Sequence, residues 1–173
     1  WLLFRVLIPI STFVDVVPFF GVFCSSIVIF LEVISFLFTS CSKESTSIPV
    51  QTEDDIIQYI EDNNLDATRS NSGLYYIIEN QGTGDRPTSN SNVTVAYKGY
   101  FLDGSVFDQS SSEGITFNLQ QVISGWTEGI AYFNEGGEGI LLVPSNLGYG
   151  SKNYNGIPGG SVLVFDIKLL KVN

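Results

Sequence analysis

The chain has 173 residues, with 18 acidic and 8 basic side chains and a formal charge of −10 at pH 7. This length suits one modest domain with appendages, and the acidic balance argues against a nucleic-acid partner because no basic patch is available to neutralise phosphates. Histidine is absent and Cys24 and Cys41 are the only cysteines, which excludes a Cys/His zinc site, a His-based triad and a thiol–histidine dyad. We therefore expect no metal and no cofactor.

Residues 1–40 are mostly apolar, but Arg5, Asp15, Pro18 and Glu32 interrupt them. No uncharged run of roughly 20 residues, the length that a membrane-spanning helix needs, is left intact. Residues 27–38 fit the short apolar region of a signal peptide better. We interpret residues 1–40 as a signal peptide or a hydrophobic anchor.

This apolar segment leads into the run FTSC at 38–41. Small residues before a cysteine resemble the bacterial lipobox, in which the cysteine becomes lipidated and N-terminal after cleavage, although Phe38 stands where that pattern usually has leucine. Cys41 is then the predicted lipidation site, and the processed chain keeps no free thiol, which is compatible with an oxidising envelope compartment. The alternatives are an ordinary cysteine in a linker and an uncleaved anchor.

Residues 41–51 are rich in small polar and charged side chains and predict a flexible tether. A helix is predicted to begin at Thr52, because a capping hydroxyl is followed by three acids in the first turn and by apolar residues along one face. Asn63 and Asn64 are expected to end it. Residues 52–71 are therefore interpreted as a short acidic helix and linker that packs against or spaces the domain.

From Gly73 onwards the pattern changes to strands separated by turn clusters. Residues 74–79, 93–101, 139–143 and 163–169 each predict a strand, and the Asp103-Gly104 pair predicts a hairpin turn because it tolerates positive φ. One short helix is predicted over about 126–133. A mostly antiparallel sheet covered by one helix implies an α+β domain of about 100 residues, placed at 72–173.

The run VISGW at 122–126 is the most informative stretch of this domain. We interpret it as a short apolar strand that turns at Gly125 into the short helix and places the indole of Trp126 under an apolar cavity. The alternative is an ordinary strand-to-helix junction.

Five further motifs accompany it in order: VAYKG at 95–99, DGSVFD at 103–108, LGYG at 147–150, IP at 157–158 and LVFD at 163–166. Together the six motifs resemble the signature of FKBP-type peptidyl-prolyl cis-trans isomerases, over about residues 72–172. The resemblance implies a strongly twisted antiparallel sheet wrapped around one short helix, with a binding pocket between them. With the acidic helix and the lipobox, the chain also resembles envelope lipoproteins of this family in Bacteroidetes-type bacteria.

The resemblance assigns roles to individual residues. The residues expected to act in catalysis are Tyr97, Asp108, Ile123 and Tyr149. The residues expected to bind substrate are Phe107, Phe117, Val122, Trp126, Ile157 and Phe165. In this arrangement Trp126 forms the floor of the pocket, while Tyr149 and Ile157 lie at its rim.

Three positions depart from the family pattern. Ile115 stands where an aromatic residue is frequent, which puts one wall contact in doubt, and Gly148 stands where alanine is more usual. Pro158-Gly159-Gly160 replaces a longer or stiffer segment and predicts a more mobile rim.

These residue types suit rotation about an X-Pro bond, whose barrier is about 18–20 kcal/mol because rotation breaks amide resonance. No bond is made, so no nucleophile is needed. The twisted amide is less polar than the planar one, and an apolar pocket therefore favours it. The Tyr149 hydroxyl and the Ile123 backbone N–H could donate hydrogen bonds to substrate carbonyls, and Asp108 could orient Tyr97.

The expected function is a prolyl isomerase acting on proline-containing unfolded or partly folded envelope proteins. It would be lipid-anchored through Cys41 in the bacterial cell envelope, facing the periplasm or the cell surface, and macrolide inhibitors of the family are candidate ligands. Two alternatives remain: a non-catalytic chaperone or proline-peptide binding module with the same fold, and a structural lipoprotein with a vestigial pocket. Taken singly, Trp126 and Phe165 could be core residues, Asp108 a turn residue and Tyr149 a packing residue.

Overall fold

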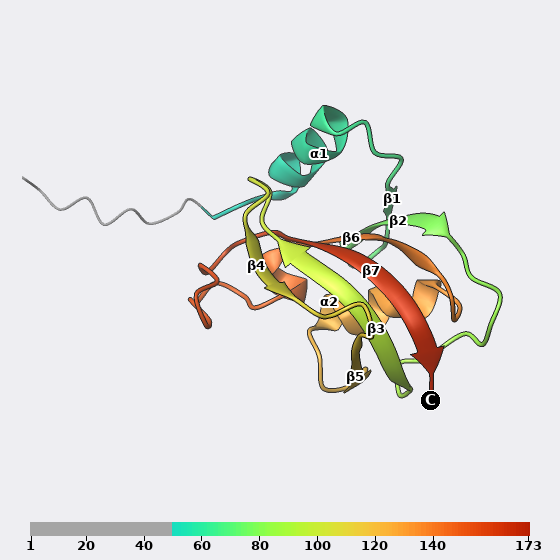
Figure 1. Cartoon of the computed structure of the whole chain (residues 1–173). Coiled ribbons are helices and arrows are strands. Elements are labelled where there is room, and N and C mark those ends of the chain that lie inside the picture. Colours follow the sequence, from blue (N-terminus) through green and yellow to red (C-terminus); the bar gives the residue numbers. More distant parts are fainter. Residues whose placement is uncertain (1–49) are drawn as a thin grey trace, which may run out of the picture. The chain divides into compact units, whose positions relative to one another are not determined.

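The computed structural model describes residues 50–173, which belong to one compact unit of the chain (Figure 1). The predicted signal peptide or anchor at 1–40, Cys41 and most of the predicted tether lie outside the described residues. Within them, the structure has no helix that is long and apolar enough to cross a membrane.

The described residues form one antiparallel sheet. Its strands are β1 (Thr68–Arg69), β2 (Tyr75–Asn80), β3 (Asn92–Tyr100), β4 (Val106–Gln109), β5 (Ile115–Asn118), β6 (Glu138–Val143) and β7 (Leu163–Val172). They are arranged in the order β1-β2-β6-β7-β3-β4, and β5 also pairs with β3. The long strands β3 and β7 form the centre, so they fix the curvature on which the site is built.

Strand β7 is buried on both faces at its start, over Leu163–Phe165, whereas Lys168 further along its second face is exposed. Leu163, Phe165, Ile167 and Leu169 alternate along it and are buried in the larger core cluster, which confirms the predicted alternation. Val164 points to the opposite face and is also fully buried, in a second cluster. Because the start of β7 is buried on both faces, the sheet needs a covering element on each side there.

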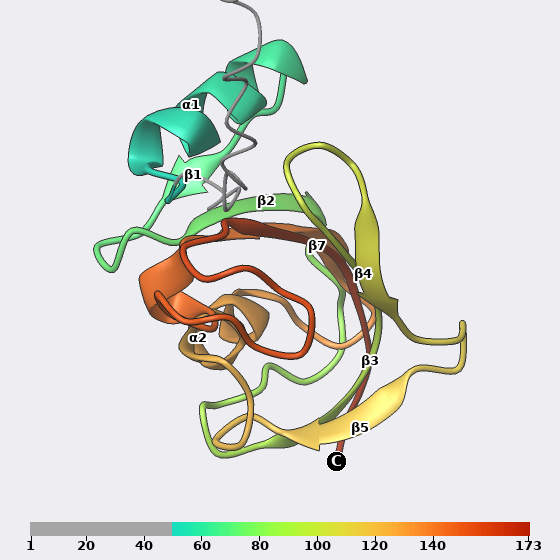
Figure 2. The same ribbon diagram turned by 90° about the vertical axis from the view of Figure 1, so that its left-hand side faces the viewer.

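Helix α2 (Ser124–Gly129), continued by a 3₁₀ turn over Ile130–Tyr132, covers the concave face. Figure 2 shows the sheet wrapped around this helix, as expected for the α+β fold. Trp126 and Ile130 pack with buried residues of β6 and β7 in the larger cluster. The predicted short helix is therefore confirmed, but it begins two residues earlier than expected.

The predicted strand-to-helix hinge at Gly125 is wrong. Val122 lies in a bend and Ile123 is the extended residue that caps α2, so neither belongs to a strand, and Gly125 lies inside α2. A Cβ at Gly125 would lie 2.6 Å from Val143 Cγ1, and a Cβ at Gly129 would lie 2.6 Å from Leu141 Cδ1. The two glycines thus lie one turn apart and let α2 pack closely on β6, which outweighs the low helix propensity of glycine.

Helix α1 (Glu53–Asp62) covers the opposite face of the sheet (Figures 1 and 2). It begins after Thr52, whose backbone N–H donates to the Asp55 carboxylate at 2.6 Å. It ends at Asn63, as predicted, and Asn64 adopts a left-handed φ of 52°. Ile56 is 1% exposed and packs with Val164 in the second cluster, so α1 is part of the folded unit.

We expect Ile56→Ala to lower the free energy of unfolding by about 2–4 kcal/mol, because it leaves a cavity between α1 and the sheet. The matched control is Ile57→Ala at the next position, where the side chain is 41% exposed and the expected loss is below about 1 kcal/mol. Urea denaturation followed by circular dichroism measures both. Equal losses for the two variants would contradict the packing of α1 on the sheet.

Candidate active site

A cavity of about 360 Å³ lies between α2 and the sheet, and it is bounded by residues of β3, β4, β5, β7 and two loops. Its lining residues are Tyr97, Phe107, Asp108, Phe117, Gln121, Val122, Ile123, Trp126, Tyr149, Tyr154 and Phe165. All but one of the residues predicted for catalysis or substrate binding are in this set. The structure therefore brings together residues that are far apart in the sequence.

Trp126 has aromatic rings around it on several sides. Its ring makes edge-to-face contacts with Tyr97, Phe117 and Phe165, at centroid distances of 5.0, 5.4 and 5.3 Å. Such contacts are the favoured geometry of aromatic pairs and fix the orientation of the indole. Trp126 is only 4% exposed, and its Nε1, which has no partner among residues 50–173, is itself buried, so the indole faces the cavity with its ring carbons.

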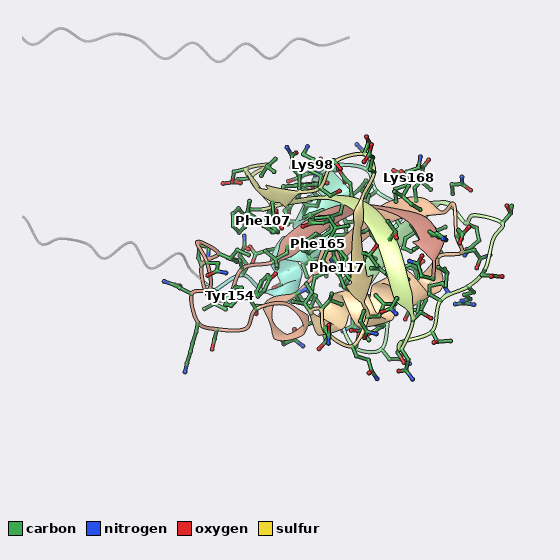
Figure 3. All side chains as sticks on the ribbon, turned by 60° about the horizontal axis from the view of Figure 1, so that its bottom comes forward. Lys98, Phe107, Phe117, Tyr154, Phe165 and Lys168 are labelled. Atoms are coloured by element: carbon green, nitrogen blue, oxygen red, sulfur yellow. The ribbon has the colours of Figure 1, made fainter. Side chains whose placement is uncertain are left out.

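Phe165 and Phe107 extend this aromatic wall toward the β3–β4 hairpin. Their rings are 5.6 Å apart and almost perpendicular. Gly99 of β3 lies beside them, and a Cβ there would come within 2.9 Å of both rings. Figure 3 shows Phe107, Phe165 and Phe117 in succession, with Tyr154 on a loop to their lower left.

Tyr97 and Asp108 form the polar edge of the cavity. The Tyr97 hydroxyl donates a hydrogen bond to Asp108 Oδ2 at 2.7 Å. Burial of the phenol, followed by this hydrogen bond and the Asp108 charge, raises the pKa of Tyr97. The phenol is therefore a hydrogen-bond donor at neutral pH, and the Asp108 carboxylate holds its orientation.

Tyr149 and Tyr154 stand at the open side of the cavity, on residues 148–158, which we call the rim loop. Their rings are stacked at 4.7 Å with an angle of 10° between the planes. The side chains are 37% and 51% exposed. Burial, followed by the neighbouring Tyr154 and Asp108, raises the pKa of Tyr149, so its phenol also keeps its proton.

Ile123 lines the cavity at the position that caps α2. Its carbonyl accepts the backbone N–H groups of Trp126 and Thr127, at 2.9 and 3.2 Å. Backbone N–H groups at the start of a helix have no intrahelical partner. The geometry is thus compatible with the predicted use of the Ile123 N–H as a donor.

Ile157 is placed differently from its expected position at the rim. It is 7% exposed and packs in the larger core cluster, and it is not among the residues that line the cavity. Ile115 is 44% exposed and does not line the cavity either, whereas Phe117, two residues further along β5, does.

Tyr154 and Gln121 line the cavity although the sequence analysis did not select them. A signal for Tyr154 was present in the following Asn155-Gly156 pair, because this dipeptide favours a tight hairpin turn. In the structure both residues have positive φ, and Tyr154 and Ile157 exchange two backbone hydrogen bonds across them. The turn presents Tyr154 to the cavity and directs Ile157 into the core.

Among residues 50–173, no group of three or more acidic or cysteine side chains is arranged to hold a metal ion. The cavity itself is an apolar aromatic enclosure with phenols, the Ile123 backbone and the Asp108 carboxylate at its edge.

A sequence model of the family described as FKBP-type peptidyl-prolyl cis-trans isomerase matches residues 84–170, half of the chain. The chain belongs to the FKBP-type isomerase family. The match spans every cavity residue, from Tyr97 to Phe165, and it contains all six sequence motifs.

Individual FKBP-type relatives agree with this assignment. The chain is 46% identical over 108 residues to the isomerase FkpA of Buchnera aphidicola subsp. Schizaphis graminum, which covers 61% of this chain and 43% of that protein. It is 43% identical over 105 residues to FkpA of Escherichia coli K12, covering 60% and 39%. The chain thus spans about two fifths of the length of these curated relatives.

Solved FKBP-type structures share the fold. The crystal structure of FkpA from Escherichia coli has a TM-score of 0.64 and 36% sequence identity, covering 69% of this chain and 58% of that chain. A peptidyl-prolyl cis-trans isomerase from Pseudomonas syringae has a TM-score of 0.63 and 30% identity, covering 70% and 92%. The second comparison shows that the domain described here accounts for nearly all of a solved isomerase.

The raised pKa of Tyr97 makes stability depend on pH in the alkaline range. The unfolded chain ionises this phenol near its ordinary pKa of about 10, while the folded chain does not, so the free energy of unfolding should fall as the pH rises above that value. Tyr97→Phe removes one such group and should reduce this slope. Urea unfolding at pH 8, 10 and 11 measures it, and an unchanged slope in Tyr97→Phe would contradict the proposed environment of the phenol.

Proposed function

We propose that this chain is a peptidyl-prolyl cis-trans isomerase that accelerates X-Pro bond rotation in folding envelope proteins. The observation that carries the proposal is the aromatic cavity floored by Trp126, with Tyr97, Asp108 and Tyr149 at its edge. Membership of the FKBP-type family supports it. Client proteins that are unfolded or partly folded expose their X-Pro bonds and can reach a cavity open to solvent.

In this mechanism the proline ring rests on Trp126 and the aromatic walls exclude water from the X-Pro amide. The ground-state amide is planar and polar, whereas the twisted transition state has lost its resonance. An apolar enclosure costs the twisted amide less desolvation energy than the planar one, so it stabilises the transition state relative to the ground state. The protein does not make or break a covalent bond in this step.

The edge of the cavity supplies orientation. The Tyr149 hydroxyl and the Ile123 N–H donate hydrogen bonds to substrate carbonyls on the two sides of the X-Pro bond and hold the twisted geometry. Asp108 is already an acceptor for Tyr97. Its role is therefore to fix the Tyr97 ring in the wall and to place a negative charge beside the amide.

Each tenfold increase in rate requires about 1.4 kcal/mol of transition-state stabilisation. Hydrogen bonds that contribute about 1 kcal/mol each, added to the desolvation effect, suffice for a roughly thousandfold acceleration. Macrolide inhibitors of the family are proposed to occupy the same cavity and to compete with the proline peptide.

We expect the protein to accelerate cis-to-trans relaxation of an X-Pro peptide. Tyr149→Phe should lower kcat/KM roughly fivefold, because it removes one donor, and Asp108→Val should lower it more than tenfold, because it also releases Tyr97. Tyr132→Phe is the matched control, since the Tyr132 hydroxyl donates to Glu128 and does not reach the cavity.

A wild-type rate equal to that in buffer would reject the isomerase proposal. Suppression of client aggregation that persists without turnover would instead favour the non-catalytic chaperone or proline-peptide binding module.

We further propose that the protein is held in the bacterial cell envelope by a lipid on Cys41, facing the periplasm or the cell surface, as in the Bacteroidetes-type lipoproteins that the sequence resembles. Support comes from the sequence alone, where an apolar segment precedes FTSC at 38–41. The proposal divides the chain into a signal peptide or anchor at 1–40, a tether at 41–51, an acidic helix and linker at 52–71, and the isomerase domain at 72–173.

Cys41→Ala should abolish labelling by a fatty-acid analogue in cells and leave an uncleaved precursor. The matched control is Cys24→Ser, which removes the chain's other cysteine and should leave labelling and size unchanged. Gel mobility and label incorporation measure both effects. Full labelling of Cys41→Ala would overturn the proposed anchor.

A further inference from the structure

Backbone hydrogen bonds hold the rim loop, despite its three glycines and the glycine pair that follows Pro158. At its base, the Gly160 N–H donates to the Gly150 carbonyl at 2.9 Å, directly after Tyr149. The Gly159 N–H donates to Asn153 Oδ1, also at 2.9 Å. The segment 158–162, which follows the rim loop and which we call the returning arm, thus lies against Gly150 and Asn153, the neighbours of the stacked tyrosines in the sequence.

Gln51 makes two hydrogen bonds to the other side of this returning arm. Its backbone N–H donates to the Gly160 carbonyl at 3.0 Å, and its side-chain Oε1 accepts the Val162 N–H at 2.6 Å. Val50 packs on the same point, because a Cβ at Gly160 would lie 3.0 Å from both of its γ carbons. Peptide groups are therefore linked in the order Gln51, Gly160, Gly150, and the last of these adjoins Tyr149.

Gln51 is itself held by helix α1. It directly precedes the capping residue Thr52, and the first turn of α1 is fastened to the sheet by Glu53. The Glu53 carboxylate pairs with Arg69 of β1 and accepts the Tyr75 hydroxyl of β2 at 2.7 Å. The buried Ile56 completes the attachment. The segment before α1 therefore links the sheet to the rim loop, because it is bonded to the returning arm and is attached to the sheet through α1.

We propose that Gln51 is a positioning residue of the active site, which fixes the returning arm 158–162 and through it the stacked Tyr149 and Tyr154. Gln51 lies outside the family-matched residues 84–170, so the family match does not account for it. The inference rests on the proposed function, because a held rim matters only where a proline peptide binds.

Amide hydrogen exchange on the full chain tests directly whether Gln51 stabilises the returning arm. Gln51→Ala should speed exchange of the Val162 and Gly160 amides at least roughly tenfold, since opening of the arm is no longer opposed by the side-chain acceptor. Gln51→Glu should behave like the wild type, because a carboxylate oxygen can accept the same N–H. The matched control is Gln58→Ala on the exposed face of α1, where the side chain donates a hydrogen bond to Asp62 of the same helix.

Kinetics on the same variants test the consequence. Gln51→Ala should raise KM for a proline peptide roughly fivefold, with kcat within about twofold of the wild type, and Gln51→Glu should restore KM. Unchanged exchange and KM in Gln51→Ala, or equal losses in the alanine and glutamate variants, would overturn the inference. If the wild type shows no turnover, the proposed function fails, and the peptide dissociation constant then replaces KM as the quantity that must rise in Gln51→Ala.

Discussion

The edge-to-face packing of aromatic rings around Trp126 is the interaction on which the rest of the structure depends. The indole is almost completely buried, yet it forms the floor of a cavity. A ring can meet both conditions only if its neighbours hold it from the sides and leave part of it facing open space. Tyr97, Phe117 and Phe165 do this from three different strands. The long central strands and the curvature of the sheet thus determine where the Trp126 side chain lies.

The close approach of α2 to the sheet follows from the same constraint. Gly125 and Gly129 remove the side chains that would push α2 away from β6, and Trp126 between them then reaches the rings of the other strands. On the opposite face, α1 covers the second cluster, and Gln51, just before α1, accepts a hydrogen bond from Val162, the residue before β7. The sheet is therefore supported from both sides, and the cavity is open to solvent beside the exposed Tyr149 and Tyr154.

Features with a local cause could be predicted from the sequence. The alternation along β7, the Asp103-Gly104 turn and the capped start of α1 depend on residues within a few positions of one another. The start of α2 could not be predicted in this way, because the β-branched Val122 and Ile123 favour a strand, whereas the close packing of Gly125 on β6 places the start of the helix at Ser124. The contact between Gln51 and Val162 spans 111 positions in the sequence, and no local sequence pattern predicts it.

In the candidate site, too, some features could be predicted from local sequence and others could not. Five of the six motifs placed most of the lining residues, because each of these five contributes at least one side chain to the cavity. Ile157 was expected at the rim, but the tight turn at Asn155-Gly156 directs it into the core and exposes Tyr154 instead. The direction of a side chain in a short hairpin depends on the turn type, which the motif at 157–158 does not contain.

The central claim is that this cavity accelerates X-Pro rotation by enclosing the twisted amide, without proton transfer or a covalent intermediate. NMR exchange spectroscopy on an X-Pro peptide with a catalytic amount of the protein, in H₂O and in D₂O, tests it most directly. The account predicts faster exchange between the cis and trans signals, by the same factor in both solvents. Exchange at the uncatalysed rate, or a large solvent isotope effect, would contradict it.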